Sequence, residues 1–204
     1  DSRIAVFSTG NVYGLVPVSG GGSVEADPRN PTGEYAMSCL GRERVFEHFS
    51  RTHGTPMSIV RLNYACELRY GVLVDLATRI KNEQPIDLTM GSFNVIWQGD
   101  ANAHALASLA DCDSPPFVVN VTGPETLSVR TVSERLANRM NLPVTFEGKE
   151  STTALLNNAR LSHERYSKPE MSASQLLNNV ADWVRDGGDS LGKATGFEVR
   201  DGRF

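Results

Sequence analysis

The sequence predicts an α/β protein with part of a doubly wound parallel sheet, followed by a smaller α+β region. A short apolar run, Ile4 to Phe7, ends in Ser8-Thr9-Gly10, as a central parallel strand does before a loop. A helical segment from Tyr35 to His53 is then stopped by Gly54-Thr55-Pro56 and followed by a second apolar run, Met57 to Leu62. Strands and helices that alternate through short links are typical of parallel α/β folds.

Later elements continue this alternation. Apolar residues at helical spacing predict helices over 72–81, 100–110, 128–140 and 173–185. Apolar runs predict strands near 85–88, 93–97, 117–121 and 144–146. Ser128 is an expected N-cap, and Ser172 with Gln175 matches a capping box. Residues 14–34, rich in Gly, Pro, Ser and Asn, predict a long loop.

The helix over 35–53 contains two features of different character. Met37, Leu40, Val45, Phe46 and Phe49 can share one apolar face, which we expect to be its buried side. The charged run at residues 42–44 is expected to face solvent.

Composition excludes several classes of protein. The 204 residues carry a net charge of −4, without a Lys/Arg-rich block, which argues against a nucleic-acid partner. No apolar run approaches the ~20 residues that span a bilayer, and no signal peptide is visible, so no membrane association is expected. The three cysteines show no metal-binding spacing, so we expect no metal site and a reducing, cytoplasmic location.

The candidate chemistry comes from Thr9 and Tyr35. Open parallel sheets bind their ligands at the carboxyl ends of their strands, where Thr9 falls, and Tyr35 opens the helix that follows. Both side chains can therefore converge on one substrate hydroxyl or carbonyl. The alternative is that Thr9 only caps a strand end and that Tyr35 packs on the preceding loop.

These motifs resemble the extended short-chain dehydrogenases, the NAD-dependent epimerase/dehydratase family. In that family a strand end of the form S-[ST]-x-x-V-Y-G precedes a Y-x-x-x-K helix. Ser8 to Gly14 and Tyr35 to Ser38 are similar to these elements, and Arg61-Leu62-Asn63 and the segment 120–129 are similar to two later ones. The resemblance extends over nearly the whole chain.

The resemblance implies a function and a set of site residues. Thr9 and Tyr35 would be catalytic, with Tyr35 moving a proton while a hydride passes to or from NAD or NADP. Tyr35, Asn63, Tyr64 and the position of Cys39 would contact the cofactor. The reaction would be epimerisation, dehydration or reduction of a sugar-like, small-molecule substrate.

The resemblance also implies a division of the chain and a homodimer. Residues 1–120 would be the C-terminal half of a Rossmann domain, with 63–95 contributing to the second domain. Residues 121–188 would form the substrate domain. Apart from the resemblance, the final residues of the sequence, 189–204, are expected to be a flexible tail. Residues 36–53 would form the dimer contact.

Three departures from the family pattern carry consequences. Cys39 stands where the family has a lysine, which lowers the tyrosine pKa and holds the ribose; Arg42, one turn later, is a candidate substitute. The stretch 93–97 lacks the Arg-Asp pair that grips a nucleotide diphosphate, which argues against a UDP- or dTDP-sugar substrate.

The third departure is that no Gly-rich phosphate loop follows a first strand. Because the chain starts at Asp1, almost directly on a strand, we expect that loop upstream in a longer parent protein, so that the main cofactor-binding residues lie outside this chain. The competing hypothesis is a non-catalytic relative that binds a dinucleotide, or no ligand, and acts as a structural or regulatory partner.

Overall fold

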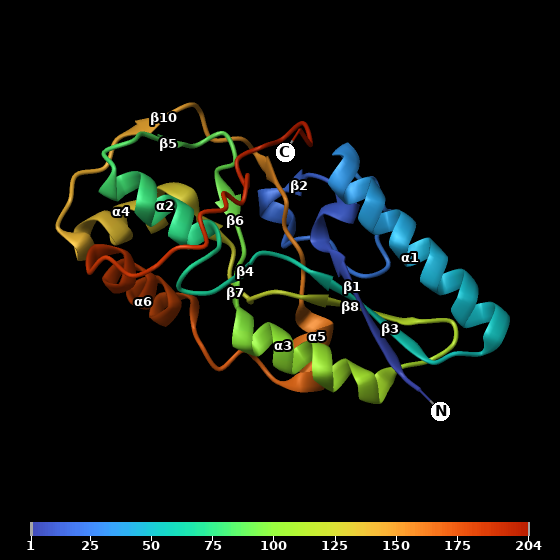
Figure 1. Cartoon of the computed structure of the whole chain (residues 1–204). Helices are drawn as coiled ribbons and strands as arrows, with labels where there is room; N and C mark the ends of the chain where they lie inside the picture. Colours follow the sequence, from blue (N-terminus) through green and yellow to red (C-terminus); the bar gives the residue numbers. More distant parts are fainter. Residues whose placement is uncertain (1, 204) are drawn as a thin grey trace.

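The central element is a three-stranded parallel sheet. The computed structural model describes residues 2–203; Asp1, the start of the predicted first domain, and Phe204, the end of the predicted tail, lie outside the described residues. Strands β1 (Ile4–Thr9), β3 (Met57–Leu62) and β8 (Phe117–Val121) pair in the order β1-β3-β8. Helix α1 (Gly33–His53) lies on one side of the sheet, and α3 (Gln98–Ala107) and α5 (Arg160–Tyr166) lie on the other (Figure 1). This is the predicted fold class, a partial Rossmann-like sheet.

Strand register brings the functional ends of the strands together. Thr9 is aligned with Leu62 in the β1–β3 pair, and Leu62 is aligned with Val121 in the β3–β8 pair. All three strands therefore end at one edge. Because β1 directly precedes the loop that leads to α1, the start of α1 returns to that same edge.

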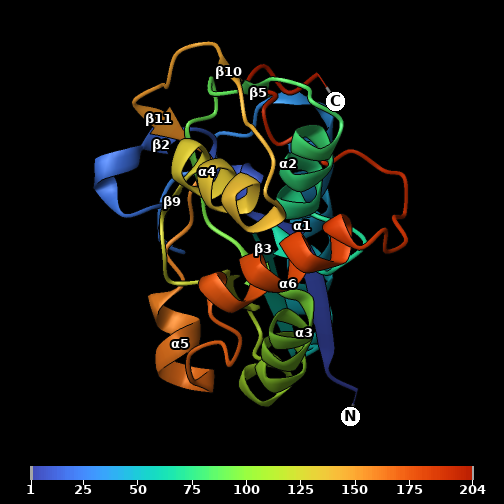
Figure 2. The same ribbon diagram turned by 90° about the vertical axis from the view of Figure 1, so that its left-hand side faces the viewer.

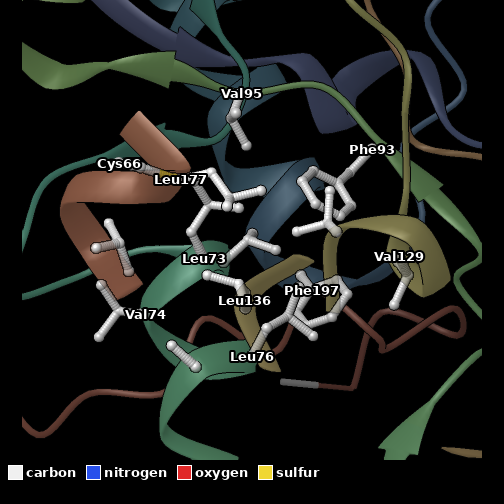
Figure 3. Packing of buried hydrophobic residues seen from close by; sticks show 14 of the residues in the cluster. Cys66, Leu73, Val74, Leu76, Phe93, Val95, Val129, Leu136, Leu177 and Phe197 are labelled. Atoms are coloured by element: carbon white, nitrogen blue, oxygen red, sulfur yellow. The ribbon is translucent and has the colours of Figure 1, made fainter. Parts of the chain in front are cut away.

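A second core lies beside the sheet. Helices α2 (Val72–Lys81), α4 (Val129–Met140) and α6 (Ala173–Arg185) pack against one another (Figure 2). Their apolar faces meet in a cluster that includes Leu73, Leu136 and Leu177 (Figure 3). Ser128 and Ser172 cap α4 and α6 as predicted, the latter in a capping box with Gln175.

Short strands and 3-10 turns connect these two parts. The strand predicted over 93–97 is divided into β6 and β7 by Asn94 and Val95, and α5 has no counterpart among the predicted helices. The two-residue strands are β2 (Val16–Pro17), β4 (Ala65–Cys66), β5 (Ile86–Asp87), β6 (Ser92–Phe93), β7 (Ile96–Trp97), β9 (Leu127–Ser128), β10 (Phe146–Glu147) and β11 (Thr153–Ala154). The 3-10 turns are Gly10–Tyr13, Val18–Gly20 and Ser108–Asp111.

Helix α1 turns a different face to the sheet from the one predicted. Its buried residues are Ala36, Cys39, Glu43 and Ser50, whereas Met37, Val45 and Phe49 are about half exposed. The expectation that the large apolar residues form the buried side is therefore wrong for these three residues. Small side chains let the helix approach the sheet closely, and Glu43 is buried because it pairs with a cation of β3.

The C-terminal segment also differs from the expectation of a free tail. Phe197 is 3% exposed and lies within the second core (Figure 3). Thr195 donates its hydroxyl to Asp75, and Arg200 donates to the Thr153 carbonyl at 2.8 Å. One buried aromatic ring and these polar contacts together hold residues 195–200 against the molecule.

Within residues 2–203, no helix is both long enough and apolar enough to cross a bilayer.

Candidate active site

Thr9 ends β1 and begins the loop that follows it. The side chain is 5% exposed, and its oxygen accepts a hydrogen bond from the Asn11 backbone N–H at 3.2 Å. This bond caps the 3-10 turn, so the capping role considered for Thr9 is present. Because the oxygen acts there as an acceptor, the hydroxyl proton remains available for another partner.

Tyr35 lies in the first turn of α1, and it lines the same cavity as Thr9. Desolvation raises the pKa of the Tyr35 phenol above its ordinary value, while a side-chain hydrogen bond with Thr9 lowers it. The charge of Arg42 also lowers this pKa, whereas Cys39 raises it. Tyr35 and Thr9 are thus neighbours that can address one reacting oxygen.

A buried polar network supports the loop behind Thr9. Arg61 of β3 donates to both carboxylate oxygens of Glu43, at 2.9 and 2.8 Å, and both side chains are 1% exposed. Arg61 also donates to the Tyr13 hydroxyl at 2.7 Å, which donates to Asn120 at 2.8 Å. Ser8 donates to Glu43 at 2.6 Å. The network joins the three strands to α1 and fixes the residues on either side of Thr9.

The charged run 42–44 is therefore not a uniform solvent-facing surface. Glu43 is buried, and burial alone would lower the pKa of Arg61, but the hydrogen bonds from Arg61 to Glu43 raise it above its ordinary value. The guanidinium is therefore firmly charged, and the interpretation of Glu43 as solvated is wrong.

Asn63 and Tyr64 follow β3 and line the same cavity. Asn63 is 1% exposed, and its amide donates to the Asn94 side chain at 2.7 Å. Tyr64 has a positive φ of 40°, a conformation that tyrosine seldom adopts. Strained backbone of this kind often occurs at functional sites. The structure thus brings Thr9, Tyr35, Asn63 and Tyr64 to one place.

Cys39 is placed differently from those four residues. It is 2% exposed, packs against Val12 and Tyr13, and does not line the cavity. Arg42 donates to the Phe7 carbonyl at 2.7 Å and lies 3.9 Å from the Cys39 sulfur. The positive charge nearest to Tyr35 on this helix is therefore that of Arg42, not of a residue at position 39.

The cavity has a volume of about 400 Å³ and contains residues that the sequence analysis did not assign to it. Tyr70, Gly71 and Val72 contribute from the start of α2, and Thr195 and Phe197 from the C-terminal segment. A tyrosine and a glycine before a helix carry no specific signal, and the C-terminal segment has no periodic pattern. The cavity thus lies between the sheet and the second core.

Comparison with solved structures gives the same architecture. UDP-glucuronic acid 4-epimerase from Bacillus cereus superposes with a TM-score of 0.77 at 16% identity, covering 91% of this chain and 62% of that chain. UDP-glucose 4-epimerase from Thermus thermophilus, solved with NAD, gives 0.75 at 20% identity, with 91% and 65% covered. DesIV, a dTDP-glucose 4,6-dehydratase from Streptomyces venezuelae, gives 0.75 at 18% identity, with 91% and 60% covered.

No protein-family model matches the sequence, and the search of curated proteins finds no match. At identities of 16% to 20%, the structural likeness shows a shared fold. The chain spans 60% to 65% of the length of these three enzymes. The chain thus shares part of the fold of these sugar-nucleotide epimerases and dehydratases.

Proposed function

We propose that this chain supplies the catalytic residues of an NAD(P)-dependent epimerase, dehydratase or reductase that acts on a sugar-like hydroxyl or carbonyl compound. The observation that carries the proposal is the shared cavity of Thr9 and Tyr35 at the carboxyl edge of a parallel sheet. Structural neighbours of the same fold were solved with NAD or NADPH, which supports a nicotinamide cofactor.

Tyr35 would be the proton donor and acceptor. Its raised pKa keeps the phenol protonated at neutral pH, so it is ready to give a proton to a developing alkoxide. Thr9 would donate a hydrogen bond to the same substrate oxygen. To act as a base, the phenol needs a nearby positive charge, and Arg42 supplies one, although from a position where it is also bonded to the Phe7 carbonyl.

The described residues fit the reacting end of a nicotinamide cofactor only in part. Asn63 and Tyr64 line the cavity and would contact it, whereas Cys39 is buried away from the cavity and offers no ribose contact. No Gly-rich phosphate loop occurs in the sequence. When bound, the nicotinamide would supply the hydride acceptor or donor, while this chain would orient the substrate and move the proton.

The division of the chain follows from this proposal. We propose that residues 1–120 contain the dinucleotide-binding half and that 63–95 and 121–188 form the substrate part, because the buried residues of these two segments share one core. The cavity between the two cores would then hold the nicotinamide end of the cofactor next to the substrate.

Replacement of Tyr35 by phenylalanine tests the proposal. Tyr35→Phe removes only the phenol oxygen, and we expect NAD(P)-dependent turnover to fall by about 10²–10⁴-fold. The matched control is Tyr166→Phe, whose hydroxyl bonds to Asp111 on the far side of the sheet. Turnover that survives in Tyr35→Phe and matches that of Tyr166→Phe would remove the enzymatic proposal.

The second candidate is a non-catalytic relative of the same fold, and the burial of Cys39 favours it. In that case neither the natural protein nor Tyr35→Phe turns over a substrate, because the lysine expected at position 39 is missing. Cys39→Lys separates the two candidates: turnover that appears only in Cys39→Lys indicates lost catalysis, whereas turnover of the natural sequence that Tyr35→Phe abolishes excludes the non-catalytic candidate.

We further propose a homodimer through α1. Met37, Val45 and Phe49 recur at intervals of four or eight residues and are 56%, 55% and 49% exposed, which leaves an apolar stripe along one helix face. Light scattering after size-exclusion chromatography is expected to give a dimer mass, and Val45→Glu is expected to give a monomer. A monomeric natural chain would contradict the dimer.

The free thiols Cys39, Cys66 and Cys112 form no disulfide in the structure. Unpaired thiols suit a reducing compartment, so a cytoplasmic location belongs to the same proposal. Localisation of the tagged protein by fractionation tests it.

A further inference from the structure

We propose that the Thr9–Tyr35 cavity binds a neutral, polyhydroxylated compound such as a free sugar or cyclic polyol, and not a nucleotide diphosphate sugar. This inference rests on the proposed function, because it names the substrate class of the same site. It differs from the substrates in the names of the structural neighbours, several of which are UDP or dTDP sugars.

The cavity is lined by neutral polar groups and aromatic rings. None of its described lining residues carries a charged side chain. Hydroxyl groups come from Ser8, Thr9, Thr195 and the tyrosines 35, 64 and 70, and amides come from Asn11 and Asn63. Such groups suit the hydroxyls of a neutral ligand, whereas a buried diphosphate requires cations that pair with its charge.

The electrostatic surroundings also disfavour an anion. Burial raises the pKa of the Tyr64 phenol, and the charge of Glu198 raises it further. Burial likewise raises the pKa of Tyr70, with Asp75 adding to the effect. Two carboxylates therefore act on this part of the cavity, and Glu198 is already paired with Arg79. Arg79 is thus committed to Glu198 and Arg42 to the Phe7 carbonyl, and no described lining residue supplies a cation that could pair with a diphosphate.

The start of α2 is the one feature at the cavity wall that ordinarily attracts anions. Here the Val72 and Leu73 backbone N–H groups donate to the Cys66 thiol, whose pKa burial raises to about 12. Asp75 adds a carboxylate in the first turn of the same helix. The Cys66 thiol therefore occupies two of the backbone N–H groups that an anion would bind, and the Asp75 carboxylate offsets the positive end of the helix dipole.

The C-terminal segment limits the size of the ligand. Phe197 packs against Phe93 with ring centroids 6.0 Å apart, and Thr195 donates to Asp75 through its backbone N–H at 2.8 Å and its hydroxyl at 2.6 Å. This segment forms one wall of a cavity of about 400 Å³, near the lower end of the usual range for ligand pockets. The part of the cavity beside this segment therefore has the size of a single sugar ring or a similar small ligand.

Ligand-observed NMR by saturation transfer, with calorimetry for affinities, tests the inference on the full chain. The neutral probes are D-glucose, D-galactose and myo-inositol, and the anionic probes are UDP and UDP-glucose. Ala65→Leu enlarges a half-buried residue of the cavity wall, and Ala103→Leu makes the same change in a separate cavity beside α3. If Ala65→Leu fails to fold by circular dichroism, Asn11→Phe replaces it.

We expect at least one neutral probe to bind, to lose affinity about tenfold or more in Ala65→Leu, and to keep it in Ala103→Leu. UDP and UDP-glucose are expected to bind no more tightly than that probe. Failure of every neutral probe to bind, or binding of UDP-glucose at least about tenfold tighter and sensitive to Ala65→Leu, would overturn the inference.

Turnover distinguishes this failure from failure of the proposed function. A nucleotide sugar that is converted in a Tyr35-dependent reaction would overturn the neutral-substrate inference and leave the enzymatic proposal in place. A neutral sugar that binds in the cavity without Tyr35-dependent turnover would support the neutral-ligand inference and contradict the enzymatic proposal.

Discussion

Thr9, at the carboxyl end of β1, and Tyr35, in the first turn of α1, line a single cavity although they are 26 residues apart in the sequence. A hydrogen bond between their side chains lowers a phenol pKa that desolvation raises. The loop between them is tied to the sheet by the Tyr13–Arg61–Glu43 network. Buried contacts thus hold Thr9 and the loop, whereas Tyr35, which is 50% exposed, reaches the cavity from the start of α1.

Removal of the Arg42 charge should change the titration of Tyr35. Arg42 lowers the pKa of Tyr35 electrostatically, so Arg42→Met is expected to move that pKa upward. The measurement is an NMR titration of ring-labelled tyrosine, with the Tyr35 signal assigned from Tyr35→Phe. Arg44→Met, which removes an exposed charge of the same helix that pairs with Glu47, should leave it in place. An equal shift in both variants would contradict the role of Arg42.

The buried ion pair between Glu43 and Arg61 should dominate the stability of the sheet edge. Glu43→Gln leaves a fully buried guanidinium without its counter-charge, and we expect the free energy of unfolding to fall by about 3–5 kcal/mol. Urea denaturation measures this change. The control on the same helix is Glu47→Gln, whose partners Arg44 and Arg51 are exposed, with an expected loss below about 1 kcal/mol. Equal losses of unfolding free energy in the two variants would show that the buried ion pair contributes no more to stability than the exposed one.

His104 should make stability depend on pH below neutrality. Its imidazole is 4% exposed, its Nδ1 has no hydrogen-bond partner among the described residues, and burial followed by the charge of His163 lowers its pKa below 6.5. The unfolded chain therefore binds more protons, so stability is fully present above the unfolded pKa and is lost as pH falls through the lower folded value.

Urea denaturation between about pH 7.5 and about pH 5 checks this linkage. His104→Leu should reduce the loss of stability on acidification, whereas exposed His53→Leu should follow the natural protein. A pH dependence that is unchanged in His104→Leu would assign the effect to other groups.

Much of the fold could be predicted because its signals are local. The spacing of apolar residues in α2, α4 and α6 and the capping residues Ser128 and Ser172 specify these helices without reference to the rest of the chain. The convergence of Thr9 and Tyr35 was predicted from one topological rule, since parallel strands end at a common edge, whereas Asn63 and Tyr64 were expected at the site only from the family resemblance.

The remaining features depend on partners distant in the sequence. Glu43 lies in a charged run, and its burial could not be predicted because its partner Arg61 is 18 residues away in the sequence. Met37 matches the apolar spacing of a buried face, but α1 packs against the sheet through smaller side chains such as Ala36 and Cys39. The C-terminal segment contributes Thr195 and Phe197 to the cavity through contacts with Asp75 and Phe93, more than a hundred residues earlier. Such contacts cannot be predicted from the local spacing of residue types.

The titration of Tyr35 in Thr9→Val tests most directly whether the two side chains act together. Valine keeps the shape of threonine and removes its hydroxyl, so the hydrogen bond that lowers the Tyr35 pKa is lost. We expect the pKa of Tyr35, followed by NMR, to rise in Thr9→Val and to stay at its natural value in Thr126→Val, which lies at a different cavity. An unchanged Tyr35 pKa in Thr9→Val would contradict the account, because the two hydroxyls would then not share a site.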